Sequence, residues 1–140
     1  MKIMISGSSQ FAKEMFELEA KLKELGHEAV APIGMEPHLE DGTFGNNLEE
    51  NLKFCLENDI MRKNFNQLAG QDAVVVFNKE KKGISGYMGV STLMETAIAY
   101  FLKKKIFIMF PLPSMHKERW VHEVTIMQPV ILNGNLSKII

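Results

Sequence analysis

Residues 72–78, "DAVVVFN", place five consecutive apolar side chains between an aspartate and an asparagine. A run that is apolar on both of its alternating faces is typical of a central strand in a parallel sheet, because helices cover such a strand on both sides. This stretch therefore predicts an α/β fold in which strands and helices alternate along the chain.

Further apolar runs and helical patterns flank this strand on both sides. The predicted strands are residues 2–6, 27–32, 72–78, 105–110 and 129–132, and the predicted helices are residues 10–25, 47–68 with a break near Asn58–Asp59, 91–102 and 116–127. The glycine-rich residues 34–46 predict a long loop, and loops of this length are often functional. The pattern predicts one domain, residues 1–140, with a flavodoxin-like, Rossmann-like three-layer fold and a five-stranded parallel sheet in the order 2-1-3-4-5.

The predicted fold also predicts where a ligand binds. In open α/β sheets, ligands lie beyond the carboxyl ends of the strands, near the point where the strand order reverses. The loops at that edge are residues 7–11, 78–90 and 110–116. We therefore expect the functional residues among these three segments and at the start of the helix that follows the second.

Composition excludes several classes of partner. The chain has 140 residues and a formal net charge of −1, and no dense basic face predicts nucleic-acid binding. Its single cysteine, Cys55, excludes an internal disulfide and is typical of a packing residue in a reducing compartment. The N-terminus does not resemble a secretory signal, and no apolar stretch reaches the roughly 20 residues of a membrane span. We expect a cytoplasmic protein with no membrane partner.

Residues 86–105, "GYMGVSTLMETAIAYFLKKK", carry one acidic residue, Glu95, in an otherwise uncharged helix that we expect to be buried nearly all round. The structural explanation is a capping box, in which Glu95 accepts from the backbone N–H of Thr92. The functional explanation is a carboxylate beside the ligand cleft, which can attack an anomeric carbon or stabilise an oxocarbenium-like centre. Asp72 is a second acid that could approach the same edge, or an ordinary residue at the start of a strand.

Other chemical motifs are missing from the sequence. The four histidines have no metal-ligand spacing, and neither a Walker loop nor a G-x-G-x-x-G turn follows the first strand. No serine-hydrolase elbow is present. We expect His116 and His122 to face solvent or an interface.

The first strand with its Gly-Ser turn ("MISGSS"), the stretch "QDAVVVFN" and the stretch "GYMGVSTLMETAIAYFLKKKIFIMF" together resemble the nucleoside 2-deoxyribosyltransferase-like superfamily, which includes 2′-deoxynucleoside 5′-monophosphate N-glycosidases. The resemblance covers roughly residues 1–110. Its helix motif, E-x-(G/A)-x-A, is Glu95–Ala99 in this sequence.

The resemblance implies roles for individual residues. Glu95 would be the nucleophile on C1′ of a deoxyribose, and Asp72 would position or protonate the leaving base. The resemblance further implies substrate contacts from Gly7, Ser8, Ser9, Phe11, Tyr87, Gly89 and Ser91. It implies a nucleoside or nucleotide as the small-molecule partner, no cofactor or metal, and a homo-oligomer.

The sequence also departs from the superfamily pattern. Many members carry a tyrosine in the first strand that supports the nucleophile, and the corresponding position here is Met4. A non-catalytic nucleotide-binding module is therefore an alternative. "GVSTLME" also resembles the glycine-rich loop of the phosphoribohydrolases that release cytokinin-type bases, but that family's paired glycines and arginine are missing. Lys79, Lys81 and Lys82 favour a phosphorylated ligand, or form a solvated charged loop.

Overall fold

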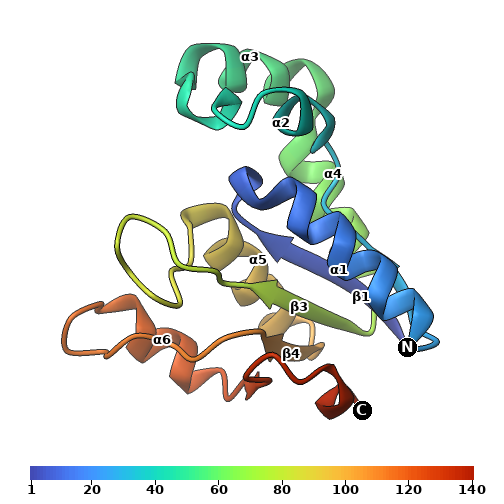
Figure 1. The fold of residues 1–140 in the computed structure, drawn as a ribbon, viewed down its shortest axis with the longest axis vertical. Coiled ribbons are helices and arrows are strands. Elements are labelled where there is room, and N and C mark those ends of the chain that lie inside the picture. Colours follow the sequence, from blue (N-terminus) through green and yellow to red (C-terminus); the bar gives the residue numbers. More distant parts are fainter.

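A five-stranded sheet forms the centre of the computed structural model, which describes residues 1–140 (Figure 1). All neighbouring strands are parallel, in the order β2-β1-β3-β4-β5, so the predicted fold class and strand order are confirmed. The strands are β1 Lys2–Gly7, β2 Glu28–Val30, β3 Ala73–Phe77, β4 Lys105–Ile108 and β5 Val130–Ile131. The α-helices are α1 Ala12–Glu24, α2 Glu36–Glu40, α3 Leu48–Asn58, α4 Ile60–Ala69, α5 Val90–Phe101 and α6 Trp120–Ile126; short 3₁₀ turns are η1 Ser9–Phe11, η2 Phe44–Asn46 and η3 Leu136–Lys138.

Alternation along β1 assigns its side chains to two separate cores. Ile3 and Ile5 pack in the cluster that contains the buried face of α1, whereas Met4 packs in the cluster that contains residues of α4, α5 and α6. Because successive side chains of a strand point to opposite faces, the sheet is covered on both sides. The all-apolar β3 is buried along its whole length, as its sequence predicts.

The segment 34–46 is more ordered than the sequence predicts. It contains α2 and η2 rather than a continuous loop, so this prediction is wrong for those residues. Pro37 lies in the first turn of α2, where its fixed φ favours helix and its missing N–H is not needed. In Figure 1, α2 and α3 project together from one end of the molecule.

The long helix predicted over residues 47–68 is two helices. Asp59 adopts a left-handed conformation with φ 49° between α3 and α4, so the predicted break is confirmed. An interruption of this kind changes the direction of the chain. It allows α4 to pack on the sheet while α3 lies beyond the sheet edge.

Helix α5 is less buried than its composition predicts. One face packs on the sheet, but Val90 is 75% exposed and Phe101 is 81% exposed, so the expectation of burial nearly all round is wrong. The last helix, α6, begins at Trp120 rather than at residue 116. None of the helices combines the length and the apolar character needed to cross a membrane.

Candidate active site

A cavity of about 480 Å³ opens at the carboxyl edge of the sheet. Its volume lies within the range typical of small-molecule sites. It lies between β1 and the start of α5 on one side and the segment 34–65 on the other. Seven of the residues predicted for the site line it: Gly7, Ser8, Ser9, Tyr87, Gly89, Ser91 and Glu95.

Glu95 is a buried carboxylate in the lining of this cavity. It belongs to the face of α5 that packs on the sheet, together with Thr92, Thr96 and Ala99, and it is only 7% exposed. Its Oε1 accepts a hydrogen bond from Ser6 Oγ at 3.0 Å, whereas Oε2 is buried without a hydrogen-bond partner. Burial raises the pKa of Glu95 to about 7, although the Ser6 hydrogen bond opposes this rise.

The capping box predicted for Glu95 is wrong. Gly89 is the N-cap of α5, so Glu95 lies in the second turn of the helix, too far along to cap its first N–H groups. The Thr92 carbonyl accepts instead from Thr96 Oγ1, at 2.7 Å. Capping therefore does not explain a carboxylate at this position.

Ser6 is a candidate site residue, through its hydrogen bond to Glu95, that the sequence interpretation missed. Met4 and Ser6 lie on the same face of β1, two residues apart, and Ser6 is closer to the carboxyl edge. Met4 is fully buried in the core on the α5 side and does not line the cavity. Strand alternation alone places Ser6 toward α5, so the signal was present in the sequence.

The loop that follows β3 contributes a basic side chain to the cavity. Lys81 Nζ donates to Ser8 Oγ at 2.8 Å, which ties this loop to the turn after β1. Burial, and secondarily the charge of Lys82, lower the pKa of Lys81. The ammonium groups of Lys81 and Lys82 lie 6.0 Å and 5.7 Å from the centroid of the Tyr87 ring.

The start of α5 faces the same space. Gly89 and Ser91 both line the cavity, and no side chain caps the helix. The first N–H groups of α5 are therefore available to an anion, which the helix dipole also favours.

The structure places two predicted site residues elsewhere. Asp72 precedes β3 and lies at the amino edge of the sheet, where its carboxylate accepts from the Lys2 N–H at 2.8 Å. The expectation that Asp72 approaches Glu95 is wrong. Asp72 lies at the amino edge of the sheet and Glu95 at the carboxyl edge, so the length of β3 separates them. Phe11 is buried in the core on the α1 side, edge-on to Phe77, and does not line the cavity.

The other wall of the cavity comes from a segment in which the sequence predicts no site residue. His38 of α2 and the side chains of Phe54 and Cys55 on α3 line this wall. Burial raises the pKa of the Cys55 thiol, which opposes a nucleophilic role and agrees with packing. The ring of His38 lies edge-on to Phe44, with centroids 5.0 Å apart.

A larger hollow, of about 890 Å³, lies at the opposite edge of the sheet. The starts of β4 and β5 line it together with exposed side chains such as Phe101 and Ile140. None of the buried polar atoms that lack a partner belongs to its lining.

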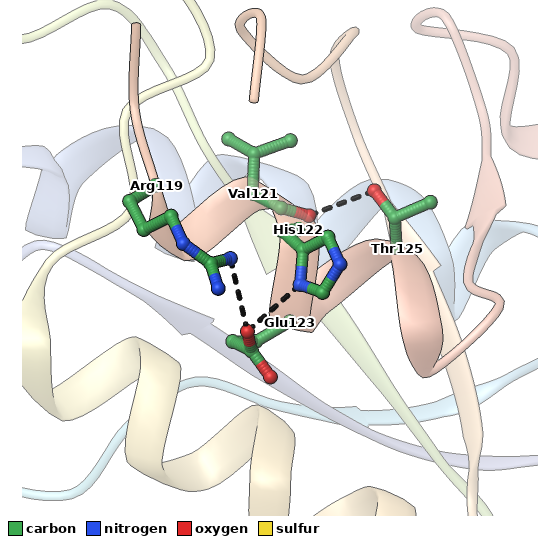
Figure 2. A network of polar contacts seen from close by, with 5 residues as sticks. All are labelled: Arg119, Val121, His122, Glu123 and Thr125. Atoms are coloured by element: carbon green, nitrogen blue, oxygen red, sulfur yellow. Dashed lines mark hydrogen bonds and ion pairs between the residues drawn. The ribbon is translucent and has the colours of Figure 1, made fainter. Parts of the chain in front are cut away.

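Figure 2 shows the polar contacts on α6, which are local to that helix. Glu123 accepts from Arg119 at 3.2 Å and pairs with His122 at 2.8 Å, and the His122 contact is the main cause of the lowered pKa of Glu123. These exposed groups form an ordinary surface network. No cluster of three or more His, Cys, Asp or Glu side chains in the molecule is arranged to hold a metal ion.

A scan against models of protein families finds no match, and a search of curated proteins finds none either.

Proposed function

We propose that the protein cleaves the N-glycosidic bond of nucleosides or their 5′-monophosphates, by hydrolysis or by transfer of the sugar, with Glu95 as the nucleophile. The observation that carries this proposal is Glu95 itself. One of its oxygens is held by Ser6, and the other is buried without a partner at a cavity large enough for a nucleoside. The resemblance to deoxyribosyltransferases supports the same role.

The chemistry requires no metal. A free oxygen of Glu95 attacks C1′ of the sugar, and the bond from C1′ to the base nitrogen breaks as the new C1′–O bond forms. The electron pair leaves with the base, which then takes up a proton. Water then attacks C1′ of the glycosyl-enzyme and loses a proton as the C1′–O bond to Glu95 breaks, which releases the sugar and restores the carboxylate. A second base that attacks in place of water forms a new nucleoside instead.

The pKa of Glu95 sets the pH range of this reaction. The nucleophile must be ionised, and burial holds the pKa of Glu95 at about 7. We therefore expect kcat/KM to fall tenfold for each pH unit below about 7 and to level off above it.

A phosphate on the sugar would suit the part of the cavity that Lys81 and the start of α5 form. Lys81 supplies a positive charge, and the uncapped start of α5 supplies N–H groups. We propose that 5′-monophosphates are preferred to nucleosides, with Gly89 and Ser91 beside the phosphate.

The second candidate is a nucleotide-binding module without catalysis. Met4, buried where many superfamily members carry a tyrosine, favours this candidate. Ser6 favours the enzyme, because its hydroxyl donates to Glu95 from the same face of β1.

One experiment separates the candidates. Purified protein is incubated with ribo- and deoxyribonucleosides and their 5′-monophosphates, and free base is measured by chromatography at pH 8. The enzyme releases base, and Glu95→Ala abolishes release, whereas the control Glu80→Ala, at an exposed glutamate outside the cavity, does not. Binding without release in the wild type would instead support the module. Release from ribonucleotides alone would indicate a phosphoribohydrolase, and product only with an added acceptor base would indicate transfer.

A further inference from the structure

His38 has a buried ring nitrogen that the protein leaves without a partner. The residue lies on α2 and is 7% exposed, and its Nδ1 is buried with no hydrogen bond. Buried polar atoms in folded proteins are almost always hydrogen-bonded. Because His38 lines the cavity, a bound molecule can supply the missing contact.

The surroundings of His38 are shaped by a glycine. A Cβ at Gly45 would lie 3.1 Å from Ser9 Oγ and 3.6 Å from Cε1 of the His38 ring. The backbone of Gly45 is not in the left-handed region, so it is space rather than conformation that favours glycine here. The missing side chain leaves room between the Ser9 hydroxyl and the imidazole.

His38 and Glu95 line the same cavity, so one ligand can contact both. Ser6 holds Glu95, and Ser9 lies beside Gly45 and His38. Two residues lie between the two serines, which limits their backbones to about 10 Å apart. A nucleoside with its C1′ at Glu95 therefore reaches the His38 wall with one of its ends.

The chemistry of the walls identifies that end. Lys81 and the start of α5 provide the positive charge and N–H groups that suit a phosphate. The wall around His38 contains Phe54 and other apolar side chains, and it suits a flat heterocycle.

We propose that His38 is a specificity residue that hydrogen-bonds the heterocyclic base of the ligand through Nδ1. This inference rests on the proposed function, because it takes the ligand to be a nucleoside or nucleotide. Burial lowers the pKa of His38, against a smaller opposing effect of Asp41, so the ring is neutral at pH 8. A neutral imidazole has one donor and one acceptor nitrogen, which matches the mixed donor and acceptor edge of a nucleobase.

The test compares a ligand that has a base with one that has none. Binding of 2′-deoxynucleoside 5′-monophosphates and of 2-deoxyribose 5-phosphate is measured by calorimetry at pH 8. The proteins are wild type, His38→Phe, His38→Gln and Gly45→Ala, with His122→Gln as a control at an exposed histidine outside the cavity. Phenylalanine keeps a ring against Phe44 but has no nitrogen, and thermal unfolding verifies that each variant folds.

The expected result is a selective loss. His38→Phe weakens nucleotide binding roughly tenfold and leaves sugar-phosphate binding unchanged, as the loss of one buried hydrogen bond predicts. His38→Gln restores part of the affinity, and Gly45→Ala weakens nucleotide binding by filling the space beside the ring. Equal losses for both ligands, or no loss for either, would overturn the inference.

Failure of the inference differs from failure of the proposed function. A wild-type protein that binds nucleotides without releasing base refutes the reaction, and the His38 comparison is still decisive. A wild-type protein that releases base, with nucleotide binding unchanged in His38→Phe, refutes the role of His38 alone. A wild-type protein that binds neither ligand refutes both.

Discussion

Replacing Glu95 with glutamine should stabilise the protein, and the gain should depend on pH. Glutamine has nearly the same shape as glutamate, and its amide oxygen can still accept from Ser6 Oγ. It cannot ionise. The substitution therefore removes the cost of a buried negative charge while it retains the packing of α5 on the sheet.

The magnitude follows from the pKa of Glu95. Burial raises that pKa from its ordinary value of 4.5 to about 7. Below pH 4.5 the carboxyl group is neutral in both the folded and the unfolded chain, and it contributes no pH dependence. Between pH 4.5 and 7 the unfolded chain ionises first, so the free energy of unfolding falls as pH rises. The total fall is about 3 kcal/mol, and it is complete above pH 7.

Urea denaturation of the wild type and Glu95→Gln from pH 4 to pH 9 measures this difference directly. We expect nearly equal free energies of unfolding at pH 4, and the variant to be more stable by up to about 3 kcal/mol at pH 8. The corresponding rise in Tm at pH 8 is roughly 6–12 °C. Glu80→Gln, at an exposed position, should follow the wild type at every pH. A variant whose advantage over the wild type does not grow with pH would refute the reasoning.

Three further substitutions probe other parts of the structure. Ser6→Ala removes the donor that lowers the pKa of Glu95, so the acid limb of kcat/KM should move up by about one pH unit; an unmoved limb would show that Ser6 does not act on Glu95. Asp72→Asn should leave base release at the wild-type rate, because Asp72 lies at the other edge of the sheet, and a large loss of rate would contradict this placement. Gly86→Ala should lower the free energy of unfolding by roughly 2–4 kcal/mol in urea, since Gly86 has φ +77° and a Cβ there would lie 2.2 Å from the Pro111 carbonyl oxygen. Wild-type stability of that variant would mean that the loop relaxes freely.

The sheet and the place of Glu95 could be predicted because both depend on local patterns. The five apolar residues of β3 and the alternation of strands with helices predict a parallel sheet, and five strands suit the order 2-1-3-4-5 that the structure has. The rule for the carboxyl edge then places the start of α5 beside a cavity. The same rule, applied to Asp72, would have assigned it to the opposite edge, because that residue precedes its strand rather than following it.

The wall that carries His38 could not be predicted in this way. Helix α2 has only five residues, too few to show a helical period in the sequence. His38 packs against Phe44, and the missing side chain of Gly45 leaves space beside its ring; both features exist only in the folded chain. Phe11 is an example of the opposite error. It follows the predicted turn and is expected to contact substrate, but its ring packs into the core.

The two sides of the cavity come from different parts of the sequence. The contact that holds Glu95 comes from β1 and α5, whereas nearly all of the opposite wall comes from one continuous segment, residues 34–65. The part of that segment that precedes α4 is the one to exchange in the laboratory as a single cassette, because Glu95 and Ser6 lie outside it. Under the proposed function, such an exchange would change ligand preference and leave the nucleophile in place.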